Sequence, residues 1–386
     1  MPPSLPFIPP VTILTPLVTR VLGHNPGRFT LQGTNSYLVG SPKLARVLID
    51  TTNRVPGLET YLSHLKSQLE QCQVGCPLSA IILTHWHPDH TEGISGVLDL
   101  ARQITLRNSS VDSHVSIPVY KHPGGPDLGD LSFFNGPFEF VHDNQVIPLP
   151  TEKGDTKTIQ LRVLFTPGHA EDHICLLMED HLGQAIALFT GDAILGHGST
   201  TVRNLPEFMR SLYRIRSIAE GQEAASTAGT NFIQPPRSFM LFPAHGLEVT
   251  EYRKRIDENI ANRLDRLSKT SDFLSKNLHS VWIGESELLR FVYPEVPQVL
   301  RMAALFNLRH SLFWIASDSE PLPSPVNSPR NSLIARISDG SERTIDVSEF
   351  YYLLDCFERS QSPASGAVIE DVKYILGTDW EWKFSA

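Results

Sequence analysis

Short apolar runs that end in polar residues recur along much of the chain. TLQGTNSYLVG (30–40), RVLID (46–50) and AIILTH (80–85) have the apolar character and turn boundaries of strands. LRVLFTPGH (161–169) and AIALFTGD (185–192) repeat the design, with a polar loop after each apolar run, and FMLFPAHG does so again. Ligand sites of α/β proteins gather at such strand ends, so we expect the polar residues there to form a site.

Apolar residues at helical spacing predict helices between and after these strands. Over 205–219, Asn204 and Glu207 have the spacing of a capping box at the start of a helix. The stretch 221–238 that follows is expected to be a surface insertion. The other expected helices lie within 55–72, 248–268, 285–293 and 297–316.

The C-terminal part of the chain differs in composition. EPLPSPVNSPRNS (320–332) is rich in proline and serine, which is typical of a linker. After it, SLIARIS (332–338) and EWKF (381–384) resemble strands, and VSEFYYLLDCFER (347–359) resembles a helix. We therefore expect four parts: a main domain at 1–250, a helical extension at 251–320, a linker at 321–332 and a C-terminal extension of unknown role at 333–386.

Composition limits the class of protein. The chain has 386 residues, of which 41% are hydrophobic, so it can bury a large core. It has no run close to the roughly 20 apolar residues of a membrane helix, and its start lacks the basic region of a signal peptide. Four scattered cysteines do not form a disulfide framework, so we expect a cytoplasmic protein. The net charge of -9 argues mildly against a nucleic-acid partner.

The strongest chemical signal is LTHWHPDHTEG (83–93), which holds three histidines and an aspartate. Imidazole nitrogens suit zinc, and a carboxylate adds a hard ligand. Single residues of ligand type follow at three later strand ends, namely His169, Asp192 and His245. Histidines that are simply solvated or buried in a core would explain any one of these residues, but not the whole ordered set. The pattern therefore predicts a metal centre.

The order HxHxDH, histidine, aspartate, histidine resembles the metallo-beta-lactamase superfamily. FTLQGTNSYLVG, THWHPDHTEG, TPGHAEDH, GDAILGHGS and the helical tail are similar to a branch that includes fungal polyketide acyl-carrier-protein thioesterases and an animal endoribonuclease. The resemblance covers roughly residues 10–320 and implies a four-layer αβ/βα sandwich with a C-terminal helical, winged-helix-like extension. One departure is Thr52, which stands where the branch usually has glycine after Asp50 and Thr51.

The resemblance also implies a binuclear centre with two zinc ions per chain, or manganese in their place. His85, His87 and His169 would hold the first metal, Asp89, His90 and His245 the second, and Asp192 would bridge both. Such metals lower the pKa of water from 15.7 towards about 7, which suits hydrolysis at neutral pH.

Several further residues receive expected roles around this centre. Asp89 is the candidate catalytic residue, because it can orient the attacking water. Asp50 is expected to hold a ligand histidine in its tautomer or, alternatively, to cap its turn. His197, between two glycines, is a candidate for the rim of the pocket, and His173 is expected to be structural.

Within the branch, the favoured function is a thioesterase that releases a polyketide acyl chain from an acyl carrier protein or polyketide synthase. A metal-dependent endoribonuclease acting on single-stranded RNA is the alternative. A binding protein without turnover is a third possibility, against which the complete ligand set argues. Candidates for carrier-protein docking are Arg253, Lys254, Arg255, Arg263 and Arg266, and candidates for lining an acyl slot are Phe306, Leu308, Phe313 and Trp314.

Overall fold

The computed structural model describes residues 5–108, 116–125, 134, 136–227, 239–276, 283–298, 301–316, 333–336, 342–344 and 381–384. The expected linker at 321–332 and the expected helix at 347–359 lie outside these residues. The chain divides into two compact units, the first comprising Met1–Thr200 with Arg210–Asp257 and the second Thr201–Met209 with Glu258–Ala386. Among the described residues, no helix is long and apolar enough to cross a membrane.

The first sheet has seven strands in sequence order. They are β1 (Val11–Thr15), β2 (Val18–Leu22), β3 (Asn35–Val39), β4 (Arg46–Ile49), β5 (Leu78–Ile82), β6 (Val119–Lys121) and β7 (Glu139–Phe140). The pairs from β1 to β4 are antiparallel, whereas the pairs from β4 to β7 are parallel. The carboxyl ends of β4 and β5 therefore lie at the same edge, where Thr84 N–H donates a hydrogen bond to Asp50 Oδ1 (2.7 Å).

The second sheet has five strands in the order β12-β11-β10-β9-β8. They are β8 (Val146–Pro148), β9 (Gln160–Phe165), β10 (Ile174–Glu179), β11 (Ala185–Gly191) and β12 (Met240–Pro243). Only β11 and β12 are parallel, with Leu188 opposite Leu241. Their carboxyl ends consequently bring Asp192 and His245 to one edge, although the two residues lie far apart in the sequence.

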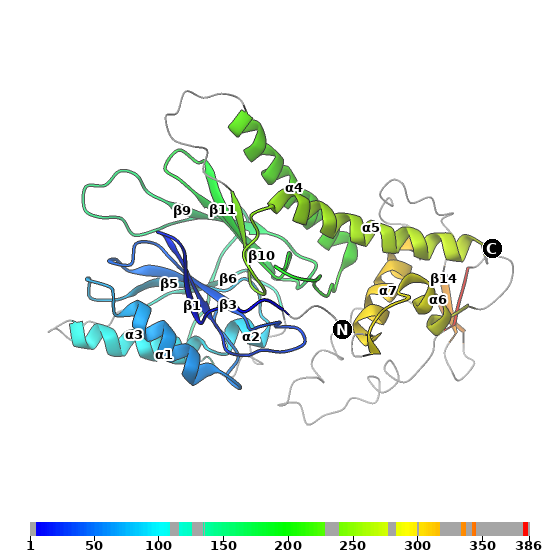
Figure 1. Cartoon of the computed structure of the whole chain (residues 1–386), viewed down its shortest axis with the longest axis horizontal. Coiled ribbons are helices and arrows are strands. Elements are labelled where there is room, and N and C mark those ends of the chain that lie inside the picture. The colour runs from blue at the N-terminus through cyan, green and yellow to red at the C-terminus, as the bar shows by residue number, and fades with distance from the viewer. Residues whose placement is uncertain are drawn as a thin grey trace. The chain divides into compact units, whose positions relative to one another are not determined.

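Two apolar layers hold the first unit together. One lies between the sheets and includes Tyr37 and Phe189, whose rings meet edge to face with centroids 5.2 Å apart. The other packs the opposite face of the first sheet against α1 (Leu58–Leu69) and α3 (Ile94–Asn108). Helix α4 (Leu205–Thr227) flanks the second sheet (Figure 1), where Ser211 Oγ donates to Pro167 O (2.8 Å). The predicted four-layer αβ/βα arrangement is thus confirmed.

Helix α4 and strand β3 differ from the sequence prediction at their ends. The cap of α4 is as predicted, because Asn204 Oδ1 accepts a hydrogen bond from Glu207 N–H (3.1 Å). The helix nevertheless continues to Thr227, into the expected surface insertion, because EGQEAAST contains several strong helix formers. Strand β3 begins only at Asn35, because Leu31 (φ 55°) and Gly33 (φ 136°) have backbone conformations incompatible with a strand.

Helices α6 (Glu285–Val292) and α7 (Arg301–Ala316) follow α5 (Tyr252–Lys276), which confirms the predicted C-terminal helices. Within the second unit, Arg309 of α7 donates to both carboxylate oxygens of Glu285 of α6 (2.8 and 2.7 Å), and both residues are buried. A four-stranded sheet joins this unit in the order β13-β16-β14-β15. Its strands are β13 (Ile283–Gly284), β14 (Leu333–Arg336), β15 (Glu342–Thr344) and β16 (Glu381–Phe384).

Candidate metal centre

The histidine motif lies on the turn from β5 into the short helix α2 (Pro88–Thr91). His87 precedes the helix with an extended backbone (φ -56°, ψ 145°), and Pro88 occupies its first turn, where a missing N–H costs nothing. Asp89 and His90 follow within the same helical turn. This change from strand to helix over a few residues lets neighbouring side chains converge on one point.

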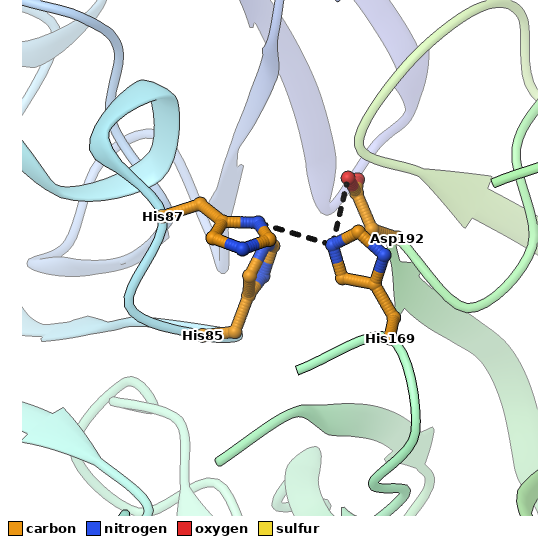
Figure 2. A group of neighbouring side chains, drawn as sticks. All are labelled: His85, His87, His169 and Asp192. Atoms are coloured by element: carbon orange, nitrogen blue, oxygen red, sulfur yellow. Dashed lines mark hydrogen bonds and ion pairs between the residues drawn. The ribbon is translucent and has the colours of Figure 1, made fainter. Parts of the chain in front are cut away.

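A first group of ligand-type side chains comprises His85, His87, His169 and Asp192, whose ligand atoms all lie within 4.8 Å of one another. His87 Nδ1 lies 2.8 Å from His85 Nε2 and 3.1 Å from His169 Nε2. Asp192 Oδ2 lies 3.4 Å from His169 Nε2. Figure 2 shows the imidazoles of the loop after β5 facing His169 and Asp192, which lie in the segments that follow β9 and β11 of the second sheet.

A second group comprises Asp89, His90 and His245. Asp89 Oδ2 lies 3.2 Å from His90 Nε2 and 3.2 Å from His245 Nε2. Asp192 also faces this group, because its Oδ1 lies 3.3 Å from His245 Nε2. The two oxygens of Asp192 therefore point to different groups, and the structure brings together all seven residues that the sequence singled out as ligands.

Hydrogen bonds at Nδ1, the ring nitrogen that points away from the centre, fix the tautomers of His85 and His90. Asp50 Oδ2 accepts from Thr84 Oγ1 (2.8 Å) and faces His90 Nδ1 (2.9 Å), as expected for a partner of a ligand histidine. A carboxylate only accepts, so His90 carries its proton on Nδ1. Thr84 Oγ1 donates to Asp50, so it must accept from His85 Nδ1 (3.0 Å). In their neutral forms, His85 and His90 therefore present Nε2 lone pairs to the centre.

The residues present fit a metal pair. His90 Nε2 and Asp192 Oδ1 are buried and face charged neighbours at 3.2 and 3.3 Å, but neither makes a hydrogen bond, although buried polar atoms normally do. Five imidazoles and two carboxylates form a nitrogen and oxygen donor set that suits zinc and similar divalent ions. The His and Asp groups could therefore bind metal ions.

The two groups differ in their electrostatics. Burial and the neighbouring histidines hold the pKa values of His85 and His87 well below the usual range. In the second group burial acts in the same direction, but Asp89 and Asp50 outweigh it and raise the pKa of His90 well above its usual value. Despite burial, Asp192 and Asp89 likewise raise the pKa of His245 to about 10.

His173 and His197 lie outside both groups. His173 is buried, and its Nε2 accepts a hydrogen bond from Asp192 N–H (3.0 Å) while its Nδ1 faces Thr166 Oγ1 (2.9 Å). It therefore holds the backbone of Asp192, which agrees with the structural role expected from the sequence. His197 is exposed. Thr52, which stands where the branch usually has glycine, does not take a left-handed φ, so its backbone conformation does not require glycine.

Several residues around the centre were missed by sequence reasoning. Thr200 Oγ1 lies 2.9 Å from His169 Nδ1 and so orients that ring. Asp172 Oδ2 lies 3.2 Å from Lys121 Nζ, both side chains are buried, and Trp86 N–H donates to Asp172 Oδ1 (3.4 Å). Burial raises the pKa of Asp172 to about 6, although Lys121 acts in the opposite direction. Threonines are common, and none of these residues stands in a metal-binding pattern.

The family is decided by comparison with known proteins. The sequence profile of the metallo-beta-lactamase superfamily matches residues 29–258. The chain belongs to the metallo-beta-lactamase superfamily. It is therefore a hydrolase of this superfamily, in agreement with the resemblance of its HxHxDH motif.

Named relatives support this assignment, and a solved structure shares the fold. A beta-lactamase-like protein 2 homolog of Caenorhabditis elegans is 31% identical over 82% of this chain and 90% of its own length. An atrochrysone carboxyl ACP thioesterase of Claviceps purpurea is 33% identical over 68% of this chain and 67% of its own length. The crystal structure of a metallo-beta-lactamase family protein from Thermus thermophilus is similar in fold, with a TM-score of 0.51 and 20% identity over 77% of this chain and 93% of that one.

The basic residues proposed for docking are mostly engaged within the protein, which corrects that expectation. Arg255 donates to Leu195 O (3.0 and 2.9 Å). Arg263 is buried and donates to Asn307 Oδ1 (3.1 Å). Arg266 lies over the Tyr293 ring, 5.0 Å from its centroid. Of the five residues, only Arg253 and Lys254 are exposed.

The residues proposed for an acyl slot also differ from one another. Leu308 and Trp314 are buried, whereas Phe306 is half-buried. The Phe313 side chain lies outside the described part of the structure. Burial of Leu308 and Trp314 is what a helical core requires, so these two residues give no support to an acyl slot.

Proposed function

We propose that the chain is a binuclear metal-dependent thioesterase that releases an acyl chain from an acyl carrier protein. In this proposal His85, His87 and His169 hold the first ion, Asp89, His90 and His245 hold the second, and Asp192 bridges them. The observation that carries the proposal is the placement of the two Asp192 oxygens, one 3.4 Å from His169 Nε2 and the other 3.3 Å from His245 Nε2. All seven residues lie in the domain proposed for residues 1–250.

When bound, such ions lower the pKa of water and polarise a carbonyl oxygen. Zinc is the ion that we favour because imidazoles dominate the donor set, with manganese as the alternative. Asp89 is the more accessible carboxylate, with 18% of its side chain exposed against 10% for Asp192. We therefore assign the orientation of the attacking water to Asp89, while Asp50, Thr84 and Thr200 keep the imidazoles in place.

The substrate class rests on the relatives and on the surface of the protein. The Claviceps purpurea relative is named for thioester hydrolysis on a carrier protein. Phe29 is 63% exposed on the loop that leads to Gly33, whose carbonyl oxygen lies 3.4 Å from His245 Nδ1. An exposed aromatic ring there suits an apolar acyl group better than a line of phosphates. The net charge of -9 also disfavours RNA.

The proposed compartment and partner follow from the same features. The described cysteines Cys72, Cys76 and Cys175 form no disulfide, which suits a reducing cytoplasm. A carrier protein, either free or as part of a polyketide synthase, would present the acyl chain. Arg253 and Lys254 remain as the exposed basic residues of the proposed docking helix.

The experiment that tests the function compares two substrates on one preparation. Zinc-loaded protein receives an acyl group attached to a phosphopantetheinyl carrier protein and, separately, a single-stranded RNA. We expect release of the free acid, its loss after treatment with a chelator, and little RNA cleavage. Efficient RNA cleavage that weakens steeply with salt, together with intact thioesters, would reverse the assignment in favour of the endoribonuclease. Elemental analysis that finds no metal in active protein would overturn the binuclear centre itself.

A further inference from the structure

A threonine far from the histidine motif in sequence contacts its catalytic candidate directly. Thr34, just before β3, is buried, and its Oγ1 donates a hydrogen bond to Asp89 Oδ2 (3.1 Å). The same oxygen of Asp89 lies 3.2 Å from the Nε2 atoms of both His90 and His245. Thr34 therefore engages the particular Asp89 oxygen that faces the second group.

The direction of this hydrogen bond is determined by Asn25, which is also buried. Thr34 N–H can only donate, and it donates to Asn25 Oδ1 (2.8 Å), which fixes the orientation of the Asn25 amide. Asn25 Nδ2 then donates to Thr34 Oγ1 (3.0 Å) and to Asn53 Oδ1 (2.7 Å). Since Thr34 Oγ1 accepts from Asn25, its own proton is available for Asp89.

The backbone around Thr34 is held on both sides. Gly23 N–H donates to Thr34 O (2.7 Å), and Asn35 N–H donates to Ala244 O (2.6 Å) beside His245. Within the intervening loop, Thr30 Oγ1 donates to Asn25 O (2.6 Å). The hydroxyl of Thr34 is therefore presented from a fixed position, as required of a group that orients another side chain.

We propose that Thr34, oriented by Asn25, is a positioning residue that fixes the carboxylate of Asp89. This inference rests on the proposed function, in which Asp89 binds the second ion and orients water. The terminal torsion of an aspartate is broad, so without a donor its two oxygens can exchange places. A fixed carboxylate affects the chemical step more than the binding of substrate, so loss of the hydroxyl should lower kcat and leave KM nearly unchanged.

The test uses two substitutions at Thr34 and one matched control. Thr34→Val keeps the branched shape and removes the hydroxyl, whereas Thr34→Ser keeps the hydroxyl. The control is Thr52→Val, because Thr52 is also buried and its hydroxyl donates to Gly23 O (2.8 Å), away from Asp89. Each variant is examined by thioesterase kinetics, by thermal unfolding of the metal-free protein and by the visible absorption spectrum of the Co²⁺-loaded protein.

We expect Thr34→Val to lower kcat about 10- to 100-fold, the range typical of residues that orient metal ligands, with KM within about twofold. Its Co²⁺ spectrum should change, because one carboxylate ligand is no longer fixed. Thr34→Ser should stay within about threefold of the unaltered protein and keep its spectrum, because the donor is retained. Thr34→Val and Thr52→Val should both lose thermal stability, because each removes a buried hydrogen bond. Thr52→Val should not, however, show the loss of kcat or the spectral change, because its hydroxyl bonds only to the backbone.

Three results would overturn the inference. The first is a Thr34→Val protein with unaltered kcat and spectrum, and the second is a Thr34→Ser protein as impaired as Thr34→Val. The third is an unaltered protein that binds no Co²⁺, which overturns the metal centre as well. If the unaltered protein binds Co²⁺ but cleaves no thioester, the substrate class alone is wrong, and the spectra of the Thr34 variants still decide this inference.

Discussion

In the proposed function, the two groups of ligand-type residues act together in one hydrolytic reaction. They differ, however, in the balance between positive and negative charge. In the first group, three histidines meet the single carboxylate of Asp192. In the second group, two histidines meet Asp89 and the other oxygen of Asp192, and Asp50 adds a third carboxylate behind His90. Burial acts to lower the pKa of His85 and His87 in the first group and of His90 and His245 in the second, but at His90 and His245 the carboxylates reverse the effect.

This difference means that the two groups have different protonation states before a metal binds. Histidines must be neutral to bind a cation. In the absence of metal, His85 and His87 are already neutral at pH 7, because their pKa values lie well below the usual range. His245 is protonated at pH 7, because its pKa is about 10, so a metal must displace a proton there. The first group can thus bind a metal without losing a proton from His85 or His87. In the second group, ion pairs between histidines and carboxylates replace the metal in its absence.

The largest effect is expected from the residue that the groups share. Asp192→Ala should remove both metals and lower kcat at least about 10³-fold, because several kcal/mol of stabilisation depend on the pair and each 1.36 kcal/mol is tenfold in rate. The measurements are metal content and steady-state kinetics. His173→Ala is the matched control, since His173 bonds to the backbone N–H of Asp192 (3.0 Å) and not to its carboxylate, and should retain metal and substantial activity. Equal metal loss in the two variants would show that the bridging role is misassigned.

The next largest effect is expected from residues that contact the proposed ligands, namely Asp50 and Thr200. Asp50→Asn should weaken metal binding at the second group about 10- to 100-fold, because an amide replaces the carboxylate facing His90 Nδ1. Thr200→Val should weaken binding at the first group less than about tenfold, because a hydrogen bond to a neutral hydroxyl is weaker than one to a charge. Calorimetric titration with Zn²⁺ measures both. A larger loss of metal affinity in Thr200→Val than in Asp50→Asn would contradict the proposed difference between the two groups.

The pH dependence of metal binding tests the comparison directly. His245 stays protonated between pH 6 and 8 in the absence of metal, but raising the pH lowers the concentration of the protons that compete with metal there. The affinity of the second group should therefore rise up to about tenfold per pH unit for each displaced proton. The affinity of the first group should change much less, because His85 and His87 have no proton to release in this range. Titrations in two buffers of different ionisation enthalpy count the released protons. Equal pH slopes for both ions would contradict the comparison.

The smallest effect is expected at His197. Its side chain is exposed and belongs to neither group, so His197→Ala should keep both metals and stay within about twofold of the original kcat. KM for the acyl carrier protein is the parameter to watch, because a residue at the rim of the pocket contacts substrate and not metal. A loss of metal in this variant would extend the centre beyond the seven residues.

Much of the centre could be predicted from the sequence, because its signals are local. His85, His87, Asp89 and His90 stand in one short motif, and His169, Asp192 and His245 each follow an apolar run. An apolar run predicts a buried strand, and a buried strand delivers its last residue to the edge of a sheet. The four-layer fold, the α4 cap and the C-terminal helices follow from patterns of the same short range.

The partners of those residues were decided only by the tertiary structure. Thr34 reaches Asp89 across 55 residues of sequence, and Thr200 reaches His169 across 31. Lys121 likewise pairs with Asp172, which lies far from it in the sequence. The pairing of β13 with β16 spans a still longer separation, and the burial of Arg263 removed it from the expected docking surface. Periodicity reports the face of an element that is buried, but not which distant side chain lies against it. The sequence alone thus predicted the seven residues proposed as ligands and determined the strands that carry them, whereas packing decided which hydroxyls and carboxylates contact each of them.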